Sequence, residues 1–366
     1  MQAVPEVARL QGVFGYALTI DVEEWYHNCL VPSYVQPQLR PDLPVELDRL
    51  LPKLLGLLAE SGCRATFFVL GEVAERLPAR VREIARAGHE VASHGFHHLR
   101  ACERPAPEFV RDIRRSKALL EDLLGEPVRG FRAPEWSLRT LASPLLPLVA
   151  AAGFDYDSSL VPYSLSGRRS NPVFASRLRW GGCEVAAPAA VAGTAARVAG
   201  GSLAGGAVRP ASSGLAGAVA AVAGFGDAAA RVELLELPVF TFGGVLRVPA
   251  GSWTGRLVEP GRLVAAAERH LARGGLPVAV AHPWEISERP TPGPLTGLAR
   301  FIHETGRAGY LPKFRHILGA LPWSTLSEAA GLRAVARAGQ AHLAAEPARV
   351  LEPPPSGGTR AALAVP

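Results

Sequence analysis

Short apolar runs alternate with amphipathic stretches along most of the chain. The apolar runs have the length and composition of buried strands and occupy residues 16–20, 64–70, 89–93, 128–131, 154–157, 234–242 and 277–281. Stretches with apolar residues at helical spacing lie between them, at 45–60, 78–88, 105–124, 143–152, 260–273 and 294–308. Such regular alternation predicts an α/β fold with a parallel sheet, either open or closed into a barrel.

The alternation stops at both ends of the chain and once in the middle. Residues 1–12 are predicted to be a leader segment and residues 13–330 to be the α/β domain. Within that domain, about residues 185–230 consist mainly of Ala, Gly and Val, which predicts a loosely packed insertion or a poorly ordered loop. Residues 331–366 are rich in Ala and then in Pro and Gly, so we expect a mostly disordered tail.

Composition is typical of a soluble globular protein. Of the 366 residues, 48% are hydrophobic and 20% are charged, and the formal charge of +6 comes almost wholly from Arg. The chain has no basic run with interleaved aromatic residues, so nucleic acid is not an expected partner. The four cysteines form no CxxC pair, which is typical of a reducing compartment. No secretory signal or membrane span is predicted; we expect a cytoplasmic protein, with peripheral association with a membrane export pathway left open.

Three histidines lie within five residues just after the predicted strand at 89–93. His94 and His98 stand four residues apart, so a helix beginning here would place both on one face, where they can chelate one metal ion. His97 could instead pair with His94 at a spacing of three. A polar loop with fortuitous histidines is the simpler alternative.

The positions of other polar residues favour a functional site over a fortuitous loop. Five polar residues stand at the C-terminal ends of predicted strands: Asp21, His94, Arg132, Asp157 and His282. In a parallel barrel these ends share one face, and active sites form there. Because burying polar groups is costly, their joint presence indicates function rather than packing.

Five motifs in the chain resemble those of a known family. They are TIDVEEW at 19–25, SHGFHH at 93–98, FRAPEWS at 131–137, GFDYDSS at 153–159 and AHPWE at 281–285. In this order they resemble the NodB-type polysaccharide deacetylases, and most of all the branch found beside exopolysaccharide and exosortase gene clusters. The resemblance implies a distorted (β/α) barrel that holds one divalent metal, usually zinc. It also implies hydrolysis of N-acetyl groups on an amino-sugar polysaccharide, as part of exopolysaccharide biosynthesis.

The resemblance also implies catalytic roles for individual residues. Asp21 matches the catalytic base, Arg132 the arginine that braces it, and His282 the general acid. Asp157 is the best match to the acidic residue that orients the catalytic histidine, with Asp155 as a rival in the same short motif.

The metal ligands are implied in the same way, with one departure from the family pattern. His94 and His98 match the two histidine ligands, a spacing that selects them over His97. Many members have two adjacent aspartates in the first motif, but here the predicted base is followed by a valine, which cannot coordinate. Glu23 points to the same side of an extended chain as the base and is the predicted third ligand, with Glu24 as the alternative.

Two imidazoles and one carboxylate leave a coordination position open for water, which is the catalytic rather than the structural pattern for zinc. A base whose pKa lies below the working pH and an acid whose pKa lies above it predict a bell-shaped dependence of the rate on pH. Trp25, Trp136 and Trp284 follow motif residues and are predicted glycan contacts, with packing at the barrel rim as the alternative. Two other functions stay open: hydrolysis of a small cyclic amide or ureide on the same barrel, and glycan binding without catalysis.

Overall fold

The computed structural model of the protein describes residues 4–13, 15–31, 40, 42–43, 45–163, 167–180, 232–243, 247–291 and 295–332. The expected insertion at about 185–230 lies outside the described residues, as does the expected tail beyond residue 332. Among the described residues, no helix is both long and apolar enough to cross a membrane.

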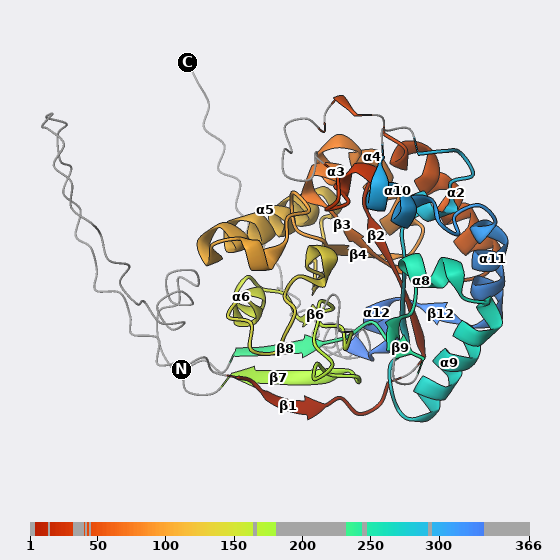
Figure 1. Ribbon diagram of the computed structural model, residues 1–366. Coiled ribbons are helices and arrows are strands. Elements are labelled where there is room, and N and C mark those ends of the chain that lie inside the picture. The colour runs from red at the N-terminus through yellow and green to blue at the C-terminus, as the bar shows by residue number, and fades with distance from the viewer. Residues whose placement is uncertain are drawn as a thin grey trace, which may run out of the picture.

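One 10-stranded sheet carries the candidate site (Figure 1). Its strands run in the order β1-β7-β8-β6-β5-β4-β3-β2-β11, with β12 beside β2. The parallel strands are β2 (Tyr16–Val22), β3 (Thr66–Val69), β4 (Glu90–Ser93), β5 (Gly130–Phe131), β6 (Tyr156–Asp157), β8 (Val232–Glu236), β11 (Val278–Ala281) and β12 (Trp323–Ser324). At one edge, β7 (Ser176–Trp180) and β1 (Glu6–Arg9) add antiparallel pairs. The predicted parallel sheet is confirmed.

The two edges of the parallel sheet meet through the segment that follows β8. Phe240 N donates to Val278 O of β11 at 3.0 Å, and Val280 N donates to Ala250 O at 3.0 Å. Gly251 has a φ of 122° and lies so close to β11 that a Cβ would collide with Val280 O. The sheet therefore curves into a distorted barrel, as expected.

Helices cover the outside of this barrel. They are α2 (Leu47–Glu60), α3 (Gly71–Arg76), α4 (Pro78–Arg86), α5 (Ala106–Leu124), α6 (Leu146–Ala151), α8 (Ser252–Leu257), α9 (Pro260–Ala272), α10 (Gly297–Glu304), α11 (Tyr310–Ala320) and α12 (Leu326–Ala329). In Figure 1, α2, α9 and α11 line one flank and α5 and α6 the opposite one. The helices bury leucine-rich faces against the strands, for example Leu51 and Leu58 of α2.

Most predicted elements are present with ends shifted by a few residues, but some features differ. β1 lies within the segment expected to be a leader, and neither β7 nor α11 was predicted. The strand expected at 234–242 consists of β8 and β9 (Thr241–Phe242), and β9 pairs with β10 (Val248–Pro249). The break falls at Pro238, which has no N–H to donate to a sheet ladder.

Candidate metal and catalytic site

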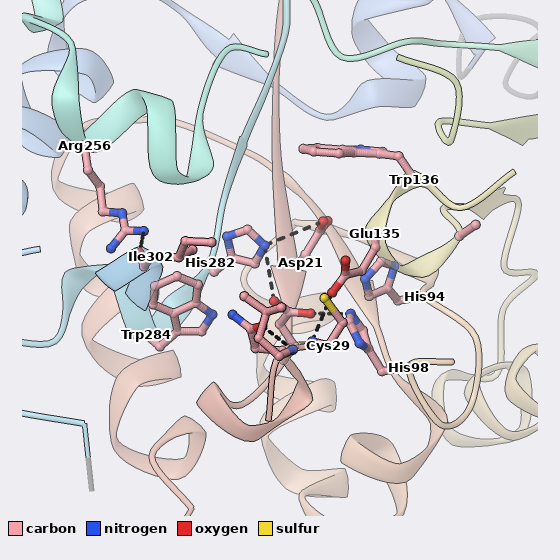
Figure 2. Close-up of a pocket in the computed structure, with 14 residues that line it drawn as sticks. Asp21, Cys29, His94, His98, Glu135, Trp136, Arg256, His282, Trp284 and Ile302 are labelled. Atoms are coloured by element: carbon pink, nitrogen blue, oxygen red, sulfur yellow. Dashed lines mark hydrogen bonds and ion pairs between the residues drawn. The ribbon is translucent and has the colours of Figure 1, made fainter. Parts of the chain in front are cut away.

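The carboxyl ends of the parallel strands surround a cavity of about 200 Å³. Asp21 belongs to the end of β2, and His94 and His282 directly follow β4 and β11. All three line the cavity together with Glu23 and His98 (Figure 2). The side chains expected to meet at the carboxyl ends of the strands therefore do meet for Asp21, His94 and His282.

Glu23, His94 and His98 form a compact donor cluster. One ligand atom from each lies within 4.8 Å of the others, and all three side chains are buried. Glu23 Oε2 is 2.5 Å from His98 Nε2. His94 Nδ1 lies 2.8 Å from the carbonyl oxygen of Arg132, which can only accept, so Nδ1 carries the hydrogen and Nε2 is the ligand atom. The residues present therefore fit the predicted three-ligand set for one divalent ion.

The two histidines reach this cluster from a loop and not from the helix that their spacing suggested. The chain after β4 has no helical turn at residues 94–98. Gly95 and His98 both have positive φ values, of 78° and 52°. This left-handed backbone turns the chain back on itself and brings both imidazoles to one point without a helix.

The two rival ligands have other partners. Glu24 Oε1 accepts from the N–H groups of Glu46 and Leu47 at 2.8 Å each, at the start of α2. Burial raises the pKa of Glu24 to about 7 despite these hydrogen bonds. His97 is partly exposed, and its Nδ1 lies 3.3 Å from Glu72 Oε2. Neither side chain takes part in the donor cluster.

Arg132 holds Asp21 from behind the cavity. Its Nη1 lies 2.6 Å from Asp21 Oδ1, and the guanidinium is completely buried. The guanidinium also donates to Thr19 Oγ1 and to the carbonyl and hydroxyl oxygens of Ser158. Asp21 therefore has one oxygen fixed by a charge-assisted hydrogen bond and the other turned toward His282.

His282 faces Asp21 and Glu23 across the cavity. Its Nε2 lies 3.3 Å from Glu23 Oε1 and 4.0 Å from Asp21 Oδ2. Burial alone would lower the pKa of His282, but the carboxylates of Glu23, Glu285 and Asp21 outweigh burial and raise this pKa to about 9. A raised pKa favours the protonated imidazole, the state that a proton donor requires.

The structure does not bring Asp157 to His282, which corrects the expectation for that residue. Asp157 accepts hydrogen bonds from the hydroxyl and the N–H of Ser159 at 2.5 and 3.2 Å, and it lies beside Glu236 of the neighbouring β8. Its rival Asp155 is exposed and lies 3.4 Å from Arg129. The carboxylate at His282 Nδ1 is that of Glu285, three residues away on the same turn, whereas Asp157 ends a strand flanked by β5 and β8.

Replacing Glu236 by Gln should make the free energy of unfolding less sensitive to pH. Burial raises the pKa of Asp157 to about 6 and that of Glu236 well above its usual value, and the two carboxyls are hydrogen-bonded to each other. When a carboxyl has a higher pKa in the folded than in the unfolded protein, the free energy of unfolding falls as the pH rises. The fall begins near the unfolded pKa, about 4, and continues toward the folded pKa. Gln supplies a donor that does not titrate. The stability of the variant relative to the wild type should therefore increase from about pH 5 to about pH 8. Urea unfolding at both pH values measures this; a pH-independent difference between the two proteins would contradict it.

Of the three tryptophans expected to contact glycan, Trp136 and Trp284 line the cavity. The Trp284 ring is also stacked on His282, with ring centroids 5.2 Å apart, and on His303, with ring centroids 4.0 Å apart. Trp25 is buried with Tyr26 in a separate apolar cluster and does not line the cavity. For Trp25 the packing alternative therefore describes the structure better.

Several residues at the cavity had no predicted role. Glu135 has a φ of 55°, and its carboxylate accepts from Cys29 N and from Arg100 at 3.2 Å each. Arg256 of α8 and Glu285 form a completely buried ion pair at 3.0 Å. Glu285 belongs to the AHPWE motif, three residues after His282, and the sequence suggested it as a partner of the site without a firm role. No local pattern marks Arg256.

Comparisons with known proteins point to one family. Residues 42–155 match the family model described as polysaccharide deacetylase, a stretch that holds His94, His98 and Arg132. The chain is 32% identical to a peptidoglycan deacetylase of Helicobacter pylori over 111 residues, which are 30% of this chain and 37% of the relative. It is 37% identical to a chitooligosaccharide deacetylase of Sinorhizobium fredii over 97 residues, which are 25% of this chain and 39% of the relative.

The chain spans less than two fifths of the length of these two curated relatives. A solved structure of a Mycobacterium smegmatis protein, provisionally assigned as a polysaccharide deacetylase, is similar with a TM-score of 0.46 and 21% identity. That similarity covers 95% of this chain and 98% of the other. These matches are to polysaccharide deacetylases, in agreement with the resemblance of the motifs to the NodB-type family. None of those reported concerns the exopolysaccharide branch.

Proposed function

We propose that this chain is a metal-dependent hydrolase that removes N-acetyl groups from an amino-sugar polysaccharide. The observation that carries the proposal is the meeting, in one cavity, of the Glu23, His94 and His98 donors with Asp21 and His282. Relatives named as deacetylases of peptidoglycan and of chitooligosaccharide support a substrate of that chemical class.

In this proposal Glu23, His94 and His98 hold one divalent ion, which we expect to be zinc. Two imidazoles and a carboxylate suit zinc and leave a position for a reacting ligand. When bound, the ion would lower the pKa of a water molecule and polarise the amide carbonyl. The buried cluster, with His94 fixed through Arg132 O, is preorganised for this role.

The chain's own residues would move the protons. Asp21 would accept a proton from the water whose oxygen attacks the acetamide carbon, and Arg132 holds the carboxylate in place for this. His282, protonated, would give its Nε2 proton to the amide nitrogen as the C–N bond breaks. The products are acetate and a free amine. Base and acid face the same cavity, with Asp21 Oδ2 and His282 Nε2 4.0 Å apart.

The experiment that tests the proposal combines metal analysis with acetate release. The purified chain is loaded with zinc and incubated with chitooligosaccharides and with N-acetylated peptidoglycan fragments. Bound zinc with acetate release supports the proposal. Bound zinc with hydrolysis of a small cyclic amide or ureide alone would favour the alternative substrate, and glycan binding without turnover would favour a binding protein.

We further propose that the polymer is an exopolysaccharide and that the protein acts on it in the cytoplasm, during biosynthesis. The motif resemblance supports the first point and the composition supports the second. Deleting the gene should then raise the acetyl content of the secreted polysaccharide, and an unchanged polymer would contradict this proposal.

Replacing Trp136 by Ala should raise the KM for a glycan substrate while leaving kcat nearly unchanged. Trp136 lines the cavity beside Glu135, where a sugar ring could stack on the indole. A lost stacking contact of about 1 kcal/mol corresponds to a roughly fivefold higher KM. Steady-state kinetics on chitooligosaccharides measures this.

Phe301 provides a matched control for that variant, since it is an exposed aromatic residue of α10 that does not line the cavity. Phe301→Ala should leave KM unchanged. If Trp136→Ala behaved like this control, Trp136 would not contact the glycan.

A further inference from the structure

Glu285 contacts His282 at two atoms. Its Oε2 accepts a hydrogen bond from His282 N at 2.9 Å and lies 3.2 Å from His282 Nδ1. A carboxylate can only accept, so Nδ1 carries a hydrogen toward Glu285. Nε2 is then the nitrogen that faces the cavity, Glu23 and Asp21.

Arg256 in turn fixes Glu285. Its Nε lies 3.0 Å from Glu285 Oε1, and both side chains are completely buried. Nη1 and Nη2 donate to the carbonyl oxygens of His303 and Ile302 at 2.7 Å each, near the end of α10. The guanidinium therefore joins α8, α10 and the short 3-10 helix Pro283–Ile286, and it compensates a carboxylate that has no access to water.

The ring of His282 is held on one face as well. Trp284 stacks on His282 with an angle of 26° between the rings, and it also stacks on His303 with an angle of 28°. Arg256 Cζ lies 5.0 Å from the centre of the Trp284 ring. Figure 2 shows Arg256, Trp284 and His282 in sequence along one wall of the cavity.

We propose that Glu285 and Arg256 are a positioning pair, which holds His282 so that Nε2 can deliver its proton to the departing amine. The inference rests on the proposed deacetylase function and adds two residues to it. Glu285 then has the role of orienting the catalytic histidine, which the motif resemblance implied for Asp157. Both side chains are completely buried, and in this proposal each acts through His282.

The consequence is a dependence on the leaving group. An amine leaves only when it is protonated, so deacetylation of a glycan needs a correctly held His282. The nitrophenolate released from 4-nitrophenyl acetate leaves without a proton, and its release should not need this pair. A purely structural role would instead affect both substrates alike.

The test compares Glu285→Gln with the zinc-loaded wild type on both substrates. Gln fills the same space but has no charge to pair with Arg256 or to orient His282. We expect kcat on a chitooligosaccharide to fall roughly 100-fold, with KM and metal content unchanged. Hydrolysis of 4-nitrophenyl acetate should stay within about threefold of wild type, the range of a minor rearrangement. Glu285→Asp should recover part of the lost kcat.

A double variant separates action through His282 from an independent effect. Adding Glu285→Gln to His282→Ala should cost no further activity on the glycan, because the group that Glu285 positions is already absent. Arg256→Lys keeps the charge but cannot reach all three partners, and it should lower glycan kcat by about tenfold. Glu288→Gln is the matched control, since Glu288 is exposed and pairs with Lys53 outside the cavity.

The outcomes that overturn the inference are distinct from failure of the proposed function. Additive losses in the double variant, equal losses on both substrates, or wild-type kcat in Glu285→Gln would each remove the positioning role while deacetylation stands. A wild type that binds zinc but releases no acetate from any glycan would instead remove the proposed function itself.

Discussion

Replacing His94 or His98 by Ala should abolish metal binding and turnover together. Each imidazole is one of three protein donors within 4.8 Å of one another, and removing one leaves a site with two ligands. The buried cavity offers no other group among the described residues that completes such a cluster. We expect metal content after dialysis to fall to background, and acetate release to fall by roughly 1,000-fold or more.

His97 supplies a matched control for this pair, because it is a histidine of the same loop with a different partner. Its Nδ1 contacts Glu72, and its side chain is 36% exposed. His97→Ala should keep both metal and activity. Loss of metal in this variant, with retention in His98→Ala, would show that the ligand spacing has been assigned wrongly.

The strand-end argument succeeded because it depends on topology alone. Parallel strands place their carboxyl ends on one face whatever their detailed twist, so Asp21, His94 and His282 could be grouped before any coordinates. Alternation along an extended chain likewise placed Glu23 beside Asp21, and both line the cavity. His94 and His98 lie close together, as their spacing suggested. A loop with left-handed residues brings them together, and not the helix that we expected.

What the sequence could not predict are lateral contacts between side chains. Asp157 ends a strand at the same face, yet its partners are Ser159, two residues later, and Glu236 of the neighbouring β8. The carboxylate beside His282 Nδ1 is that of Glu285. Arg256 lies 29 positions before Glu285 in the chain, in an α8 that no pattern had marked, so their ion pair has no local signal. A motif also cannot tell which tryptophan reaches the cavity: Trp136 and Trp284 line it, whereas Trp25 does not.

Metal binding and proton transfer should separate when the two acids of the first motif are changed one at a time. Asp21→Asn should keep the metal and lose turnover by roughly 1,000-fold or more, because Asn fills the same space but cannot accept a proton from water. Glu23→Gln should lose the metal, because the amide oxygen is a much weaker ligand than the carboxylate of the donor cluster. Metal analysis and acetate release on both purified variants measure the two properties.

The Asp21→Asn variant also tests how much the ion pair with Asp21 stabilises the buried Arg132. The guanidinium is completely buried, and Asp21 is the carboxylate it contacts at 2.6 Å, so Asn leaves a buried cation with only neutral partners, Thr19 and Ser158. We expect a loss of about 1 to 3 kcal/mol in the free energy of unfolding, alongside retained metal. A folded Asp21→Asn that lost the metal, next to a Glu23→Gln that kept it, would exchange the roles of base and ligand. The proton would then have to be taken by Glu23, which lies closer to His282 than Asp21 does.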